Sequence, residues 1–309
     1  MTKETSDLTL NNGAFMPALG LGVFQSPPKE TREAVAAALN AGYRLIDTAA
    51  SYMNEKQVGE GIKDSGVKRS DIFIVTKLWI SDYGKEEAKT AFDASLRRLG
   101  TNYVDLYLMH QPTPSEFDRT IAAYKTMETF ITDKRARAIG VSNFSPTHLK
   151  NLMAGTSVVP AVNQVELHPF FIQKKLREVH RELGITTQSW SPIGGINVYR
   201  PKDPNAVLNP LKHPTVLAIA EKYKKTPAQV VLRWQIDHGN CAIPKSVHAA
   251  RIKENFGVFD FTLMAEEVAN IDKLDTGVRG GPNPETLDTK TFSFKIDNSV
   301  EADNAARNY

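Results

Sequence analysis

The sequence has little cysteine and lacks a long apolar run. Cys241 is the one cysteine in 309 residues, so an internal disulfide is excluded and a reducing, cytoplasmic setting is predicted. No apolar stretch approaches the roughly 20 residues of a membrane helix, and the polar start MTKETSDLTLNNG contains no signal-peptide core. We therefore expect no membrane association. We interpret Cys241, which begins the apolar run CAIP, as a packed residue rather than a reactive thiol.

An excess of one charge is also missing, as is a glycine-rich phosphate loop. The 38 Lys and Arg residues against 35 Asp and Glu give a net charge of +3, dispersed along the chain. That balance does not favour a nucleic-acid partner. No GxGxxG sequence opens a helix after a strand, so a Rossmann-type dinucleotide site is not predicted. The nearest match, Gly20-Leu21-Gly22, is better interpreted as a strand end where two backbones approach closely.

The sequence does contain a regular alternation of short apolar runs and helix-period segments. Residues 8–10 and 14–16 flank Asn11-Asn12-Gly13, which predicts a hairpin. Helical patterns at 29–42 and 85–100 end in glycine, and 226–239 opens with Thr226 and Pro227. About eight continuous apolar runs, typical of parallel strands buried on both faces, lie at 19–24, 44–49, 72–79, 104–110, 136–143, 161–167, 186–191 and 241–246.

This alternation indicates the fold class. Eight βα units in a chain of this length predict a (β/α)8 barrel rather than an open sheet. No linker divides the chain, so we expect one domain over residues 1–309. Two segments interrupt the repeat: 193–212, which is rich in Gly, Pro and Asn, and the tail 277–309. Long loops on a barrel are usually lids or binding loops, so we expect both to shape a substrate pocket.

Polar side chains occur where three successive predicted strands end. Asp47 ends one strand, Tyr52 lies in the following loop, Lys77 is near the end of the next strand and His110 ends the third. Each has a structural alternative: a helix cap, a half-buried core aromatic, a snorkelling lysine and a loop histidine, respectively. Barrel strands end at one rim, and buried charges are costly unless they are paired. Together the four side chains therefore predict an active site.

These four side chains suit proton transfer to a carbonyl oxygen. A lysine ammonium beside a tyrosine lowers the pKa of the phenol, because the opposite charge favours phenolate. Asp47 would hold Lys77 charged and in place, and a neutral His110 would orient a substrate carbonyl. Tyr52 would then donate a proton at working pH. Such a donor requires a source of hydride, which predicts a nicotinamide cofactor.

The segment IPKSVHAARIKEN (243–255) is the candidate for binding that cofactor. A strand leads into Lys245 and Ser246, and the following helix carries Arg251, Glu254 and Asn255. Cations near a helix N-terminus suit a phosphate group. The alternative is an ordinary amphipathic helix with solvated charges.

These segments resemble the aldo-keto reductases. GYRLIDTAASYMNEKQVGE (42–60) is similar to the first signature of that family, and IPKSVHAARIKEN is similar to its cofactor signature. The intervening motifs VDLYLMHQP (104–112), AIGVSNF (138–144) and AVNQVELHP (161–169) match as well, so the resemblance covers roughly residues 8–280. SWSP (189–192), HQP (110–112), KSVHAARIKENF (245–256) and FDFTL (259–263) are closest to the bacterial branch that includes the 2,5-diketo-D-gluconic acid reductases.

The resemblance implies NADPH-dependent reduction of aldehydes and ketones. Its catalytic tetrad would be Asp47, Tyr52, Lys77 and His110, with Tyr52 as the proton donor and no metal. NADP(H) would lie extended across the barrel mouth. The residues implied in cofactor binding are Gly22 and Val23 at the nicotinamide end; Ser142, Asn143 and Gln164 at the carboxamide; Trp190 stacked on the nicotinamide; Ser191 and Ile193 along the pyrophosphate; Lys245, Ser246 and Arg251 at the 2′-phosphate; and Glu254 and Asn255 near the adenine.

The same resemblance places Phe24 and Trp79 in the substrate wall together with His110, and core packing is the alternative for both aromatics. Several relatives carry Trp at position 24, so this wall departs from theirs. We expect a monomer that acts on a small-molecule carbonyl compound: an aldehyde, an α-dicarbonyl or a keto sugar.

Two other functions are compatible with these residues. Lys77 could form a Schiff base in an aldolase, although Asp47 opposes the depressed lysine pKa that this chemistry needs. A barrel of this fold could also serve as a cofactor-sensing regulatory subunit.

Overall fold

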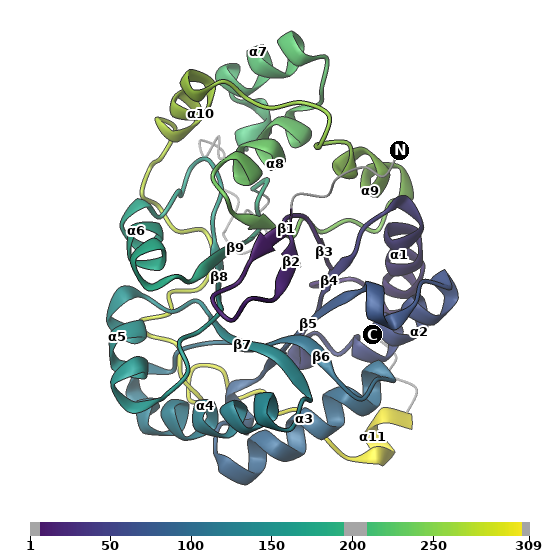
Figure 1. The fold of residues 1–309 in the computed structure, drawn as a ribbon, viewed down its shortest axis with the longest axis vertical. Coiled ribbons are helices and arrows are strands. Elements are labelled where there is room, and N and C mark those ends of the chain that lie inside the picture. The colour runs from purple at the N-terminus through teal and green to yellow at the C-terminus, as the bar shows by residue number, and fades with distance from the viewer. Residues whose placement is uncertain (1–6, 195–208, 305–309) are drawn as a thin grey trace.

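The computed structural model describes residues 7–194 and 209–304, and it confirms the predicted (β/α)8 barrel. Within these residues, eight parallel strands form one sheet in chain order (Figure 1). Bridges between Leu19 and Ala242 and between Gly22 and Lys245 join the two edges of the sheet and close the barrel. The strands are β3 (Leu21–Gly22), β4 (Leu45–Asp47), β5 (Phe73–Leu78), β6 (Val104–Met109), β7 (Ala136–Ser142), β8 (Val162–Glu166), β9 (Thr186–Trp190) and β10 (Cys241–Ala242).

The strands are shorter than the apolar runs that predicted them. The largest differences are at 19–24 and 241–246, where only two residues in each run are strand. In the second run Pro244 has no N–H to donate to a neighbouring strand. Pairing nevertheless continues past β3 and β10, because the Gly22 N–H donates to the Pro244 carbonyl at 3.2 Å. The expected close approach is confirmed at Gly22, where a Cβ would lie 2.9 Å from the Ile243 oxygen.

Helices surround the barrel as the sequence pattern predicts. The patterns at 29–42, 85–100 and 226–239 become α1 (Pro28–Ala41), α3 (Lys85–Leu99) and α8 (Pro227–Asp237). Gly42 and Gly100 end the first two in left-handed conformations with φ of 111° and 66°. The other helices are α2 (Glu55–Ser65), α4 (Phe117–Thr132), α5 (Pro146–Gly155), α6 (Lys174–Leu183), α7 (Pro214–Tyr223), α9 (Ala249–Phe256), α10 (Ala265–Asp272) and α11 (Val300–Asn304). None of the described helices is long and apolar enough to cross a membrane.

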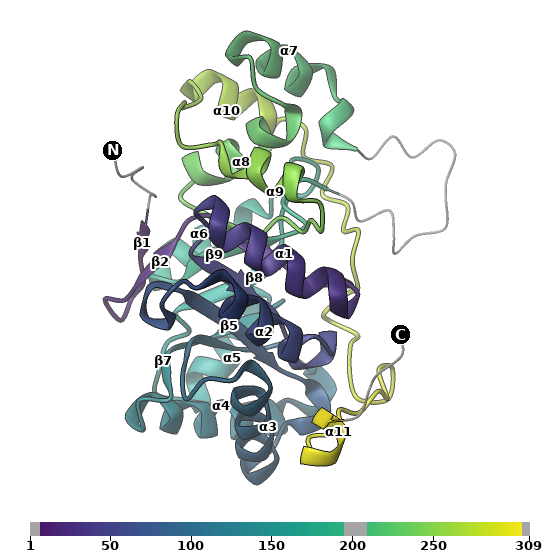
Figure 2. The same ribbon diagram turned by 90° about the vertical axis from the view of Figure 1, so that its right-hand side faces the viewer.

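The predicted N-terminal hairpin covers one end of the barrel. Strands β1 (Asp7–Thr9) and β2 (Phe15–Pro17) pair antiparallel with Leu8 opposite Met16. The turn is a three-residue one, because the Leu10 N–H donates to the Ala14 carbonyl at 2.8 Å and Gly13 takes the left-handed conformation. The hairpin and the C-terminal tail lie on opposite sides of the barrel (Figure 2).

Alternate residues of the strands face the barrel interior, and they form two layers. Toward the hairpin the layer is apolar, with Leu10 and Met16 packed on Leu45, Phe73 and Val75. Two residues further along the same strands, the interior side chains become polar, because side chains in a strand alternate with a period of two. The tail 277–304 lies at this polar end, whereas most of the predicted loop 193–212 lies outside the described residues.

Cys241 belongs to the apolar layer, which confirms its interpretation as a packed residue. Its side chain is buried, and its Sγ donates to the Pro17 carbonyl at 3.3 Å. Burial raises the pKa of the Cys241 thiol to about 12. A thiol reacts through its thiolate, so this side chain is protected from reagents in the folded protein.

We therefore expect no reaction between native Cys241 and Ellman's reagent at pH 8. One thiol per chain should react after unfolding in guanidinium chloride, which serves as the positive control. Rapid labelling of the native protein would contradict the burial of Cys241 in the barrel interior.

Candidate active site

Lys77 is the centre of the polar layer at the C-terminal end of the barrel. It comes from β5 and is 0% exposed. Its Nζ donates to Asp47 Oδ1 at 2.7 Å, to the Thr48 carbonyl at 2.8 Å and to Tyr52 Oη at 3.3 Å. These three acceptors match the three hydrogens of an ammonium group, so the geometry favours a charged lysine.

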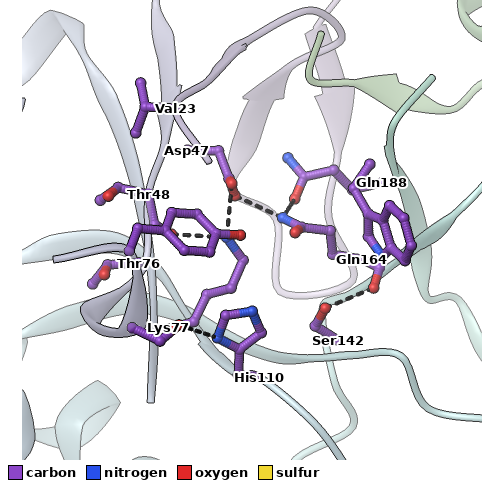
Figure 3. A network of polar contacts seen from close by, with 12 residues as sticks. Val23, Asp47, Thr48, Thr76, Lys77, His110, Ser142, Gln164 and Gln188 are labelled. Atoms are coloured by element: carbon purple, nitrogen blue, oxygen red, sulfur yellow. Dashed lines mark hydrogen bonds and ion pairs between the residues drawn. The ribbon is translucent and has the colours of Figure 1, made fainter. Parts of the chain in front are cut away.

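Asp47 is held from both of its oxygens. The second oxygen, Oδ2, accepts from Gln164 Nε2 at 2.6 Å, and the same nitrogen donates to Gln188 Oε1 at 2.7 Å. Figure 3 shows this chain of contacts running from Lys77 through Asp47 and Gln164 to Gln188. Strands β4 and β8 are not neighbours in the sheet, so the contact between Asp47 and Gln164 crosses the barrel interior.

Burial and pairing act on the two charges in opposite directions. Burial raises the pKa of Asp47 and lowers the pKa of Lys77, and the attraction between the two groups opposes both changes. If one of these buried charges lost its partner, the remaining group would therefore become neutral or would destabilise the fold. The attraction to Asp47 favours the charged form of Lys77, which places the ammonium group beside Tyr52.

His110 packs against the ring of Tyr52. The two rings meet edge to face with centroids 5.6 Å apart. Ser51 Oγ lies 3.2 Å from His110 Nδ1. Burial, together with the positive charge of Lys77, holds the pKa of His110 well below its usual range. His110 is therefore neutral near pH 7, and the Ser51 hydroxyl can either donate to Nδ1 or accept from it.

The residues predicted to hold the nicotinamide form a connected group on the adjoining strands. Trp190 Nε1 donates to Asn143 Oδ1 at 2.9 Å. Asn143 Nδ2 donates to the His110 carbonyl and to Ser142 Oγ, both at 3.1 Å. Ser142 Oγ in turn donates to the Gln164 carbonyl at 2.8 Å. Asn143 has a left-handed backbone with φ of 66°, which turns its side chain toward both Trp190 and His110.

Except for Ser191, the residues predicted near the pyrophosphate, the 2′-phosphate and the adenine line a separate cleft of about 550 Å³. Ser246 is buried beside it, whereas Lys245 and Arg251 are exposed at its edge. Neither cation forms an ion pair with any residue in 7–194 or 209–304. The cleft contains Ile193, Lys245, Ser246, Arg251, Glu254 and Asn255. Ser191, with φ of 49°, follows Trp190 in the chain. Gly22 ends β3, and the N–H of the next residue, Val23, donates to the Asp47 carbonyl at 3.1 Å.

The aromatic residues predicted to line the substrate wall surround Tyr52 and His110. Phe24 is 38% exposed, and its ring centroid lies 4.9 Å from that of Tyr52. Trp79 meets His110 edge to face with centroids 5.1 Å apart. The Trp79 indole also donates to the Phe294 carbonyl at 2.9 Å, so the C-terminal tail completes this wall.

Sequence reasoning missed three residues of this region. Ser51 contacts His110, Gln188 holds Gln164, and Glu166 binds the tail. Ser51 is adjacent to Tyr52 in the sequence. Gln188 lies two residues before Trp190 in the same strand, so the two-residue period of a strand predicts that both side chains are on one face. Among the described residues, no group of three or more His, Cys, Asp or Glu could hold a metal ion.

Comparisons with known proteins agree with this arrangement. The sequence profile of the Aldo/keto reductase family matches residues 16–276. The chain is 53% identical to morphine 6-dehydrogenase of Pseudomonas putida over 294 residues, which cover 95% of this chain and 99% of that protein. It is 44% identical to glyoxal reductase of Bacillus subtilis, covering 93% and 99%. A crystal structure of a Bombyx mori aldo-keto reductase in complex with NADP has a TM-score of 0.82 at 35% identity, covering 90% and 95%.

The ion pair leads to a stability prediction. Asp47→Asn leaves the Lys77 charge buried without its partner, so we expect the free energy of unfolding to fall by about 3 kcal/mol. The double variant Asp47→Leu with Lys77→Met removes both charges and should recover much of that loss. Urea denaturation at pH 7 measures both.

Asp64→Asn is the matched control, because Asp64 pairs with Arg32 on the surface and should change stability little. Equal stability of the Asp47→Asn protein and the unaltered protein would show that Lys77 does not depend on Asp47 for its charge.

Proposed function

Since the chain belongs to the aldo/keto reductase family of oxidoreductases, we propose that it reduces aldehydes and ketones to alcohols with NADPH and that Tyr52 donates the proton. The observation that carries this proposal is the 3.3 Å contact between Tyr52 Oη and the buried Lys77 ammonium. A phenol is a weak acid, and a neighbouring cation stabilises the negative charge that develops on its oxygen as the proton leaves.

The chain supplies the proton and the orientation of the carbonyl. Tyr52 Oη donates its hydrogen to the carbonyl oxygen, and Lys77 stabilises the phenolate that remains. Asp47 keeps Lys77 in place and charged. With Ser51 donating to Nδ1, neutral His110 carries its hydrogen on Nε2, and it donates that hydrogen to the same carbonyl oxygen. The two donors thus fix the carbonyl before the reaction starts.

The described residues fit NADP(H). When bound, the cofactor supplies the hydride that adds to the carbonyl carbon. Lys245 and Arg251, two exposed cations that pair with no carboxylate in the described part of the chain, lie at one cleft with the buried Ser246, and these are donors that suit a phosphate dianion. Trp190 offers a flat face for the nicotinamide. Gln164 donates both hydrogens of Nε2 within the protein, so its Oε1 is the atom left for a carboxamide N–H.

The aromatic wall supports a role in substrate binding for Phe24 and Trp79. Relatives named morphine 6-dehydrogenase and glyoxal reductase show that close sequence similarity accompanies carbonyl and alcohol chemistry on very different compounds. These names support the proposed class of reaction and do not identify the carbonyl compound. Four further properties stay predictions: the physiological substrate, membership of the 2,5-diketo-D-gluconic acid reductase branch, the monomeric state and the cytoplasmic location.

The two rival functions predict different experiments. A Schiff-base lysine needs an accessible neutral amine, whereas Lys77 is 0% exposed and donates to three acceptors, which argues against an aldolase. A regulatory subunit would bind NADPH without steady turnover. Steady oxidation of NADPH with a panel of aldehydes and α-dicarbonyls would distinguish an enzyme from such a subunit.

Tyr52→Phe tests the proton donor directly. The variant keeps the ring but loses the hydroxyl, so we expect kcat with a reactive aldehyde to fall by a factor of at least about 100 while NADPH still binds. NADPH oxidation followed at 340 nm, with binding measured by calorimetry, checks both. Tyr103→Phe is the matched control, because Tyr103 precedes β6 at the other end of the barrel. Undiminished turnover by Tyr52→Phe would exclude Tyr52 as the donor.

Arg251→Ala tests the choice of cofactor. Loss of a charge-assisted contact to the 2′-phosphate should raise KM for NADPH by about tenfold and leave KM for NADH unchanged. Lys253→Ala is the control, because this exposed lysine is on α9 but outside the cleft. An equal effect on the two cofactors would rule out a phosphate contact by Arg251.

A further inference from the structure

Glu166 binds the C-terminal tail where the tail crosses the end of β8. The side chain is 0% exposed. Its Oε1 accepts from the Gly280 N–H at 2.6 Å and lies 3.1 Å from His168 Nε2, and its Oε2 accepts from the Gly281 N–H at 2.8 Å. Burial would raise the pKa of Glu166, but these hydrogen bonds outweigh it and lower the pKa. Glu166 is therefore an ionised anchor for two consecutive backbone N–H groups.

The second of these glycines, Gly281, lies against Trp190. A Cβ at Gly281 would collide with Trp190 Cη2, and it would lie 3.3 Å from Cζ2 and 3.1 Å from Glu166 Oε2. The five-membered ring of the indole is tied by the hydrogen bond from Nε1 to Asn143. The indole is thus held at its five-membered ring by a hydrogen bond and at its six-membered ring by backbone that has no side chain.

We propose that Glu166 and Gly281 form a clamp that sets the position of Trp190 and thereby the affinity for the nicotinamide. Both are positioning residues, since they act through Trp190. The proposal rests on the proposed function, in which the nicotinamide stacks on that indole. Aromatic stacking depends on ring position, so a shift of the indole weakens it.

The clamp also connects the cofactor to the substrate wall. The tail that Glu166 anchors continues to Phe292 and Phe294, whose ring centroids lie 6.4 Å and 6.5 Å from that of Trp79. The tail therefore joins Glu166 to the substrate wall, and we expect a change at the clamp to affect both. A loss of the clamp should raise KM for NADPH and for the carbonyl compound more than it lowers kcat.

A double-mutant cycle tests the clamp. Gly281→Ala should raise the dissociation constant of NADPH by about tenfold, because the new methyl group displaces the indole. In the Trp190→Phe background the same change should have no effect, since phenylalanine lacks Cη2 and Cζ2. Calorimetry gives the four dissociation constants, and near-ultraviolet circular dichroism without cofactor reports the movement of the indole. Val278→Ala, an exposed change in the same tail, is the control.

Glu166→Gln is the second variant. Glutamine replaces one of the two acceptor oxygens by an N–H2 donor, so it can accept from only one of the two glycine N–H groups. We expect a similar rise in the dissociation constant of NADPH and the same change in the near-ultraviolet dichroism as in Gly281→Ala, together with a lower melting temperature than that of the Val278→Ala control, because a buried N–H loses its acceptor. Equal effects of Gly281→Ala in both backgrounds, or no effect in either, would overturn the clamp. The proposed function would stand in that case as long as turnover depends on Tyr52. Failure of the unaltered protein to bind NADPH would instead overturn the proposed function, and the dichroism would still decide whether Gly281 positions the indole.

Discussion

The ion pair between Lys77 and Asp47 is the interaction on which the other polar contacts of the barrel mouth depend. Two charges in an apolar interior are stable only when each is paired and fully hydrogen-bonded. The Thr48 carbonyl, Tyr52 and Gln164 supply those remaining bonds. Tyr52 therefore lies beside the Lys77 ammonium as one of its three acceptors. The contact that completes the hydrogen bonding of the buried lysine is also the contact that stabilises a negative charge on the tyrosine oxygen.

The two-residue period of the strands explains how this site arises on an ordinary barrel. In β4, Leu45 and Asp47 both face the barrel interior, and in β5 Val75 and Lys77 do the same. Each strand therefore changes from an apolar to a charged interior side chain over two residues. Hydrogen bonds between non-neighbouring strands are possible only in that interior. The site thus depends on barrel closure, and no single βα unit contains it.

Much of the fold and part of the site could be predicted from sequence, for identifiable reasons. The continuous apolar runs and glycine-ended helices determine the barrel, and the polar strand ends Asp47, Lys77 and His110 were visible as exceptions within apolar runs. Glu166 was not found, because its function depends on Gly280 and Gly281, which reach it only through the path of the tail. Such a contact between distant segments has no local periodicity that a sequence pattern could reveal.

Closure of the barrel joins segments from opposite ends of the chain, since Leu19 pairs with Ala242. During synthesis, the strands that carry Asp47 and Lys77 emerge long before the segment that completes their sheet. Until then β3 presents an unpaired edge, and the buried charges lack the enclosed interior that holds them together. Long-range closure of this kind is slow compared with local helix formation, and it exposes partly formed sheets to aggregation. The contacts that reach the charge pair across the barrel interior, such as that of Gln164 with Asp47, therefore require the closed barrel and cannot form in a chain that ends before β8.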